Sequence, residues 1–309
     1  DWSSDVCSSD LGMSPVTPAT GYRFLISPGV SEQEITSLMI REIDEFCRRN
    51  HLSGCSFLFV DPDWRCLLED MGYLTWVHQS FIWHNPGFGS FDDYLHLFNA
   101  NQRKNIRRER LAMKKQDLVL KAFTGDEIPK EFFQIMYRLY TRTNDKFGPW
   151  GCRYLTPGFF EGIAENYRHR LFFVGAWDES DQKYPVGMSL LVTKRDRLYG
   201  RYWGSFKNFD SLHFNTCYYF PIEWAIANGI REFNPGAGGG HKIRRGFVCV
   251  PSYSLHRYYH PRLRAIMLRN IDEINRLEHE EIDLINHKLP FSENKESIIE
   301  EATGNMSPC

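Results

Sequence analysis

Three short apolar runs follow one another in LFFVGAW (171–177), PVGMSLLVTK (185–194) and LYGRYWG (198–204). They are rich in aromatic and β-branched residues, and the polar segments DESDQKY and RDR separate them. Apolar runs of this length, joined by short polar turns, are typical of consecutive antiparallel strands. The stretch therefore predicts a three-stranded meander in the middle of the chain.

The residues that follow the meander predict a helix and two more strands. The helix is expected over about 213–228, with Gly229 as its C-terminal cap and a kink or restart at Pro221, which lacks a backbone donor. IREFN (230–234) and VPSYSLHRYY (250–259) have the composition of strands. By pattern alone, this order of elements predicts a mixed α/β fold.

Elements of both kinds are also expected on either side of this region. A capping box at the start of 31–49 opens a helical pattern of apolar residues. CSFLFV (55–60), TWVHQSFIW (75–83) and LVLKAF (118–123) predict strands, and an amphipathic helix is expected over about 262–288. The length of 309 residues allows one large or two modest domains, each able to bury a hydrophobic core.

Composition excludes several classes of protein. The chain is 42% hydrophobic and carries a formal net charge of −2, so no global basic excess indicates a nucleic-acid partner. The eight cysteines form no Cys-x-x-Cys pair, which argues against a disulfide framework or a zinc site, and we expect no metal. No stretch approaches the roughly 20 apolar residues that span a bilayer, and no leader opens the chain, so a soluble, cytoplasmic protein is expected.

A local basic segment is the strongest charge feature. On a helix, the cations of NQRKNIRRER (101–110) share faces that could bind phosphates, and Arg can do so bidentately. The alternative is a solvated helix, or one that forms salt bridges with the acidic C-terminal helix. The candidate polyanion-binding residues are Arg103, Lys104, Arg107 and Arg108.

The segment PGAGGGHKIRRGF (235–247) is the second candidate site. It is not a nucleotide-binding P-loop, because His241 stands where that motif needs Gly and Ile243 where it needs Ser or Thr. Successive glycine N–H groups can nevertheless cradle an anion beside cations. The alternative is a tight turn that needs positive φ angles. The candidate substrate- or anion-binding residues here are Gly236, Gly238, Gly239, Gly240, Lys242, Arg244 and Arg245.

His241 is the best candidate for a general base, because its unperturbed pKa lies near neutrality. Glu223 is the alternative base, and Tyr218 or its neighbour Tyr219 is a candidate to protonate a leaving group, although paired tyrosines are usually packing residues. Cys217 is a weak nucleophile candidate, since no base is paired to it in the sequence. Two aromatic residues could wall a substrate pocket or belong to the core: Trp203 and Phe214.

Three motifs together resemble a known family. LHFNTCYY with Ile222 and Glu223, FNPGAGGGHKIRRGF, and NQRKNIRRER are similar to the FemAB-like "peptidoglycan biosynthesis/recognition" family of the GNAT (N-acyltransferase) superfamily, over about Val16 to Pro290. The resemblance implies a bacterial protein with two GNAT-like lobes, whose mixed, mainly antiparallel sheets are flanked by helices. It also implies a first lobe that is incomplete at its N-terminal end.

The expected division of the chain follows from this resemblance. In order, it comprises a non-native segment (1–12), a partial first lobe (13–100), a basic linking helix (101–117), a second lobe (118–260), a C-terminal helix (261–290) and a disordered tail (291–309).

The function that the resemblance implies is the transfer of an acyl or aminoacyl group to an amine, with a cell-wall precursor as the expected acceptor. The donor is either aminoacyl-tRNA, which Fem-type transferases use and which suits the basic helix, or acyl-CoA; no tightly bound cofactor is expected. Acetyl-CoA-using relatives carry a glycine-containing turn between a strand and a helix, whereas GSFKNFDSLHFN at this position lacks those glycines. A conventional acyl-CoA N-acetyltransferase and a non-catalytic module that binds an anionic ligand remain the alternatives.

Overall fold

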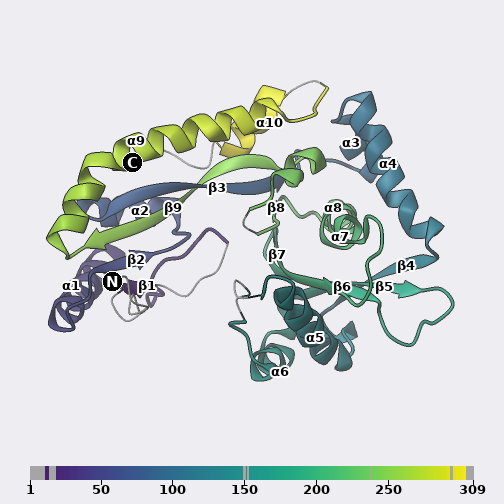
Figure 1. Cartoon of the computed structure of the whole chain (residues 1–309), viewed down its shortest axis with the longest axis horizontal. Coiled ribbons are helices and arrows are strands. Elements are labelled where there is room, and N and C mark those ends of the chain that lie inside the picture. Colours follow the sequence, from purple (N-terminus) through teal and green to yellow (C-terminus); the bar gives the residue numbers. More distant parts are fainter. Residues whose placement is uncertain are drawn as a thin grey trace. The chain divides into compact units, whose positions relative to one another are not determined.

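The structure, a computed structural model, describes residues 11–13, 19–148, 151, 153–236, 238–292 and 295–303 (Figure 1). The chain forms two compact units. Unit 1 is built from the described residues of Asp1–Ser80, Cys249–Lys288 and Thr303–Cys309, and unit 2 from those of Phe81–Val248 and Leu289–Ala302. Strand β3 (Leu74–His84) contributes its first part to unit 1 and its last part to unit 2.

In unit 1, short strands pair around β9 (Val248–Tyr258). β1 (Leu11–Met13) pairs with β2 (Gly54–Phe57) in parallel, β2 pairs with β9 antiparallel, and β3 follows β9 in the strand order. Helices α1 (Glu32–Arg49), α2 (Pro62–Asp70) and α9 (Pro261–His287) complete the unit.

The helices of unit 1 begin where their sequences supply caps. Ser31 accepts a hydrogen bond from the Glu34 amide at the start of α1, as the capping box predicts. Asp61 accepts from the Asp63 and Trp64 amides at the start of α2, and the following Pro62 has no amide to leave unsatisfied.

Two asparagines of α9 bond strand backbone in unit 1. The Asn275 side chain accepts from the Val77 amide at 2.9 Å and donates to the Thr75 carbonyl at 2.9 Å, on β3. The Asn286 side chain does the same for the amide and carbonyl of Cys249 on β9, at 2.9 and 2.8 Å. These side chains therefore take the place of a neighbouring strand at both positions.

Unit 2 contains the predicted meander. Its strands are β4 (Leu118–Thr124), β5 (Leu171–Asp178), β6 (Gly187–Lys194) and β7 (Arg197–Ser205), each antiparallel to the next. β8 (Glu232–Asn234) then pairs with β7 in parallel, and the end of β3 pairs antiparallel with β8.

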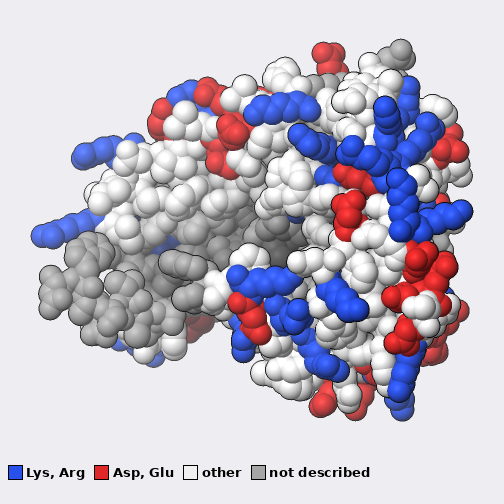
Figure 2. Space-filling view, turned by 45° about the vertical axis from the view of Figure 1, so that its right-hand side comes forward, with Lys and Arg blue, Asp and Glu red and all other residues white. Residues whose placement is uncertain are grey.

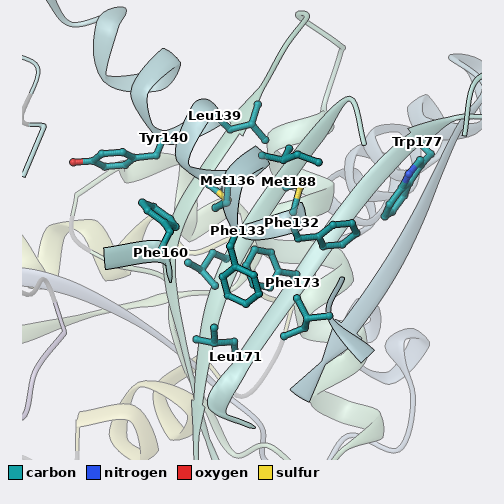
Figure 3. Close-up of a cluster of buried hydrophobic side chains, with 13 residues drawn as sticks. Phe132, Phe133, Met136, Leu139, Tyr140, Phe160, Leu171, Phe173, Trp177 and Met188 are labelled. Atoms are coloured by element: carbon teal, nitrogen blue, oxygen red, sulfur yellow. The ribbon is translucent and has the colours of Figure 1, made fainter. Parts of the chain in front are cut away.

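Helices cover both faces of this sheet, because side chains of successive strand residues point to opposite faces and nearly all of those on β5 are apolar and buried. α5 (Glu131–Asp145) and α6 (Pro157–Asn166) pack on one face, where Phe173 and Trp177 join a core with Phe132, Met136 and their neighbours (Figure 3). On the other face, Ala176 packs against the Ala112–Met113 end of α4 (Ala100–Lys115). α3 (Phe91–His96) precedes α4.

Gly204 of β7 marks a close approach between the sheet and α5. A Cβ at this position would lie 2.6 Å from the carbonyl oxygen of Leu139 and 2.8 Å from the Leu139 Cβ. Both distances are shorter than real Cβ contacts, so only glycine lets β7 and α5 pack this closely.

The helix after the meander is interrupted, as Pro221 predicts. It begins as α7 (Leu212–Phe214), continues as a π-helix over Asn215–Tyr219 and ends as α8 (Phe220–Ala227). Pro221 lies in the first turn of α8, where its missing amide costs no hydrogen bond. Gly229 follows with a φ of 67°, in agreement with the expected cap.

The fold class predicted from the sequence is confirmed, since both units combine helices with strands and most of the strand pairings among the described residues are antiparallel. The units differ from the expected contiguous division: the expected second lobe, 118–260, includes β9, whereas all but its first residue lies in unit 1. The reason is that β9 pairs with β2, which is remote in sequence. A contact between strands so far apart leaves no local signal.

The ends of the chain also differ from expectation. A disordered tail is predicted over 291–309, but Phe291 forms a β-bridge with Phe98, and α10 spans Lys295–Thr303. Ile298 and Ala302 are buried on one side of that helix, which explains its order. Residues 1–10 of the segment expected to be non-native lie outside the described residues, as do 293–294 and 304–309.

Candidate functional site

A small cavity lies in unit 2, where β7 and β8 separate. The two strands pair only as far as Tyr199 and Asn234, and the chain then turns at Pro235. The space between them has a volume of about 70 Å³, enough for a few water-sized groups. Its lining residues include Gly200, Arg201, Tyr202, Trp203, His213, Cys217, Tyr218 and Pro235.

A bulge in β7 shapes this cavity. Leu190 is paired with Tyr202 and Leu191 with Gly200, so Arg201 is the extra residue in the β6–β7 ladder. Its side-chain Nη1 is buried and has no hydrogen-bond partner among the described residues. A buried guanidinium nitrogen without a partner is costly, and its presence beside a cavity favours an anionic or carbonyl-bearing ligand there.

The hydroxyl of Tyr218 connects the cavity to His241. Tyr218 lies in the π-helix and lines the cavity, and its Oη is 3.0 Å from His241 Nε2. Burial raises the pKa of Tyr218, so its hydroxyl stays protonated. The pKa of His241 is lowered, first by partial burial and then by the cations Arg245 and Lys242, which keeps the ring neutral at pH 7.

A second histidine lies beside this pair. The His213 ring is 4.5 Å from the Trp203 ring and 5.8 Å from that of His241, measured between centroids. Burial, followed by the effects of His241, Arg245 and Lys242, lowers the pKa of His213 to about 3. His213 is therefore a neutral imidazole in the cavity wall.

The glycine-rich loop has the positive φ angles that a tight turn requires. φ is 88° at Gly236, 68° at Gly238 and 90° at Gly239. Gly240 has no positive φ and begins the 3₁₀ helix Gly240–Arg245, which carries His241. The loop therefore has the backbone of the tight turn that was the alternative interpretation, and its anion-binding role stays a prediction.

Lys242 fastens this loop rather than extending into solvent. Its Nζ donates to the Gly236 carbonyl at 2.7 Å, and the Asn234 side chain accepts from the Gly236 amide at 2.9 Å. Burial lowers the pKa of Lys242 to about 8. The side chain of Arg244, by contrast, is exposed, and its carbonyl accepts a hydrogen bond from Gln102 at 2.7 Å.

Arg245 is buried at the base of the loop. It forms an ion pair with Glu109 of α4 at 2.7 Å and donates to the His241 carbonyl at 2.9 Å. Its guanidinium carbon lies 3.4 Å from the centre of the Phe214 ring. Tyr219 also donates to the Glu109 carboxylate. Phe214 and Arg245 thus hold the loop against the helix, instead of forming an open pocket wall.

Glu223 lies elsewhere on unit 2. It forms an ion pair with Arg110 at 2.5 Å, and both side chains are partly exposed. In the part of the chain that the structure describes, no hydrogen bond or ion pair joins Glu223 to His241 or to the cavity lining. Of the two candidate bases, only His241 is linked to the cavity.

Cys217 lines the cavity as an inert thiol. Burial raises its pKa to about 12, so almost no thiolate forms at neutral pH. This environment agrees with the weak case for a nucleophilic cysteine in the sequence.

The basic segment is the helix α4, as predicted. Lys104, Arg107 and Arg108 are exposed, while Arg103 is half-buried and donates to the Phe98 carbonyl at 2.6 Å. Figure 2 shows Lys and Arg side chains gathering where α4 lies, with acidic side chains nearby. No ion pair among the described residues engages these three exposed cations, which leaves their charges available to a partner.

The link from β7 to α7 differs from a phosphate-binding turn. The Gln116 side chain accepts from the Asp210 amide at 2.9 Å and donates to the Asp210 carbonyl at 3.0 Å. Ser211 follows in the left-handed region with a φ of 59°. Gln116, the C-cap residue of α4, therefore bonds the backbone amide and carbonyl of Asp210. In a glycine-containing turn, such backbone amides would be free to bind a ligand.

Sequence reasoning missed three residues of this site: Glu109, Arg201 and His213. Glu109 carried a signal, because it is the sole acid among the cations of 103–115. Arg201 and His213 carried none, since the bulge and the approach of the π-helix depend on tertiary pairing. Within the described residues, no group of His, Cys, Asp and Glu side chains could hold a metal, and none of the helices is long and apolar enough to cross a bilayer.

Comparison with known proteins identifies the family. The FemAB-like family model, described as "Peptidogalycan biosysnthesis/recognition", matches residues 10–293, so the chain belongs to this family, in agreement with the resemblance of its motifs. No curated protein sequence matches the chain.

Solved structures are similar in fold. The C-terminal domain (DUF2156) of a putative lysylphosphatidylglycerol synthetase from Agrobacterium fabrum is 9% identical, with a TM-score of 0.52 over 72% of this chain and 74% of that one. FemX is 12% identical (TM-score 0.49, covering 76% and 79%). L-PGS from Bacillus licheniformis is 13% identical (TM-score 0.46, covering 77% and 78%).

Proposed function

We propose that this protein transfers an aminoacyl or acyl group to an amine of a peptidoglycan precursor, forming an amide. The observation that carries the proposal is the Tyr218–His241 hydrogen bond, which connects the small cavity beside β7 to a neutral imidazole. The family's description supports the acceptor class.

Amide formation needs a neutral amine and a polarised donor carbonyl. In the proposed reaction, the amine nitrogen attacks the carbonyl carbon of the donor ester or thioester, and a tetrahedral oxyanion forms. Backbone amides of β7, beyond the point where β8 stops pairing, stabilise that oxyanion. Arg201 is close enough to the cavity to add a charged donor.

Tyr218 and His241 then move the amine proton. The phenol oxygen accepts the proton from the nitrogen while its own proton passes to His241 Nε2. When the carbon–oxygen or carbon–sulfur bond to the donor breaks, the same relay in reverse protonates the leaving group. The high pKa of Tyr218 suits this role, because the phenol never needs to exist as a free phenolate.

Aminoacyl-tRNA is the favoured donor. The exposed cations of α4 suit a polyanion. In the link before α7, the Asp210 amide already donates to the Gln116 side chain, so it is not free to bind a coenzyme A pyrophosphate. Acyl-CoA is the second candidate donor. A tRNA donor further implies a cytoplasmic protein.

Binding titrations with uncharged tRNA and with CoA distinguish these donors. For tRNA, we expect the affinity to fall by about 0.7 log units per phosphate contact per decade of salt, and charge reversal at Arg107 and Arg108 to weaken binding and lower that slope. Tight binding of CoA together with a salt-independent response to tRNA would instead select acyl-CoA.

A transfer assay tests the reaction itself. Radiolabelled aminoacyl-tRNA is incubated with peptidoglycan precursors, and label in the amide product is measured for the natural protein and for His241→Ala. We expect label to appear with the natural protein and to fall sharply in the variant. Binding of the donor without any transfer, by correctly folded protein, would support a non-catalytic recognition module and contradict the proposal.

A further inference from the structure

Unit 1 contains a cavity that the proposed reaction does not use. It has a volume of about 600 Å³, within the range of about 300–1,000 Å³ that is usual for small-molecule sites. It lies between the end of α1, the turn before β3, the end of β9 and the first turns of α9. Its lining contains the three arginines Arg48, Arg257 and Arg264 and no aspartate or glutamate.

Arg257 forms a fixed wall of this cavity. Its guanidinium donates to the buried carboxylate of Asp44 and to the Met71 carbonyl, and it lies 4.3 Å from the centre of the Tyr73 ring. Arg257 and Met71 also line a second cavity of about 600 Å³, but Glu34 and Asp44 line that one as well. Of these two cavities, only the first therefore has a lining with cations and no acid. The charge of Arg257 itself is balanced by Asp44.

The uncompensated charges are those of Arg48 and Arg264. Neither has an ion-pair partner among the described residues; Arg48 lies 5.5 Å from the centre of the Tyr259 ring. Pro261 and Arg264 place the first turns of α9 in the cavity wall, and a helix N-terminus carries a partial positive charge. Two free guanidinium groups beside this helix end favour an anion, and guanidinium binds phosphate bidentately.

The rest of the lining suits an organic group. Tyr258 and Tyr259 supply aromatic rings, and Leu74 and Leu268 supply apolar surface. His256 is stacked on Tyr258, with ring centroids 6.0 Å apart and planes at 7°. Ser56 and Ser254 each lie 2.7 Å from one of its ring nitrogens, so the ring is held in place before any ligand arrives.

We propose that this cavity binds an organic phosphate, with the phosphoryl group on Arg48 and Arg264 and the organic part against Tyr258, Tyr259 and Leu268. A soluble metabolite and the headgroup of a phosphate-bearing lipid share this chemistry. All of these residues belong to unit 1, whereas Tyr218 and His241 belong to unit 2.

Calorimetric titration of the full chain tests the site with three probes: phenyl phosphate, inorganic phosphate, and phosphatidylcholine vesicles with and without phosphatidic acid. If the natural ligand is a soluble organic phosphate, we expect phenyl phosphate to bind more tightly than inorganic phosphate. If the natural ligand is a lipid headgroup, we expect the vesicles that contain phosphatidic acid to bind instead. Either result supports the proposal, provided that Arg48→Ala/Arg264→Ala weakens binding at least about 10-fold.

The matched control is Arg262→Ala/Arg269→Ala, which removes two exposed cations of α9 that do not line the cavity. It should leave binding unchanged. Arg264→Ala alone is also measured. Arg264 is an exposed side chain on α9, so we expect this variant to fold even if Arg48→Ala, which removes the contact with the Tyr259 ring, disrupts the structure. Failure of all three probes to bind, or equal weakening in the control, would overturn the proposal.

Discussion

The carboxylate of Glu109 and the guanidinium of Arg245 form an ion pair at 2.7 Å in which the side chains are only 17% and 3% exposed. The pair joins α4 to the 3₁₀ helix that carries His241. The carboxylate also accepts the Tyr219 hydroxyl, so three segments remote in sequence meet at one acid.

Glu109→Gln is expected to lower the free energy of unfolding by about 3 kcal/mol, because Arg245 would keep a buried charge without a counter-charge. Urea denaturation of both proteins measures this loss. Glu109→Gln/Arg245→Met removes the charge as well and should recover part of the stability. Arg245→Met alone completes the cycle. If the double variant loses more free energy of unfolding than the two single variants lose together, a charge-based cause is contradicted.

Tyr218→Phe is expected to reduce the transfer rate about 100-fold while leaving donor binding unchanged, because it removes only the relaying hydroxyl. Single-turnover kinetics separate the two effects. Tyr202→Phe, which alters another tyrosine of the cavity lining, is the control and should keep its rate. A Tyr218→Phe protein that transfers at the natural rate would show that the proton takes another route.

The acid limb of the transfer rate should lie below pH 6.5. The base must be neutral to accept a proton, and the lowered pKa of His241 keeps it neutral to a lower pH than an ordinary histidine. A pH–rate profile, measured under conditions in which the acceptor amine is saturating, checks this. Loss of activity already above pH 7 on acidification would assign the base to a different group.

Stability should also fall on acidification, through His256. Burial, followed by the effect of His78, lowers the pKa of His256 to about 4, so between pH 4 and the ordinary histidine value of 6.5 the unfolded chain binds more protons than the folded one. Stability is complete above about pH 6.5 and decreases towards pH 4, by about 3 kcal/mol for this residue. Thermal unfolding across this range should show a flatter slope in His256→Gln, and an unchanged slope in His279→Gln, which alters an exposed residue of α9.

Gly204→Ala is expected to destabilise the protein by about 1–3 kcal/mol, because the new methyl group would meet the Leu139 carbonyl of α5. The control is Gly162→Ala in α6, where a Cβ meets nothing within 4 Å and alanine is the better helix former. Urea denaturation should therefore show opposite signs for the two changes. Equal effects would mean that α5 can move away from β7 at little cost.

Much of the local structure was predictable because its causes are local. The meander over 171–204, the capped helix at Ser31 and the break at Pro221 each follow from a few neighbouring residues. The assignment of β9 to unit 1 was not predictable, since it depends on pairing with β2. The order of α10 depends likewise on the burial of Ile298 and Ala302.

The site was predictable in its residue types more than in its geometry. His241, Tyr218 and the glycine loop lie together as expected, because they come from two neighbouring motifs. Glu223 was expected near them as the alternative base, but it forms an ion pair with Arg110 instead. Lys242 and Arg245 were expected to face a ligand, whereas both are buried and hold the loop.

The asparagines of α9 have a consequence for solubility. Backbone groups at the margin of a sheet can recruit a strand from another molecule, which is a common route to aggregation. Asn275 and Asn286 already bond such groups at Thr75, Val77 and Cys249. These groups of unit 1 are therefore not free to pair with a strand of another molecule. A chain with both asparagines replaced by leucine would retain the helix and yet become prone to fibrous assembly.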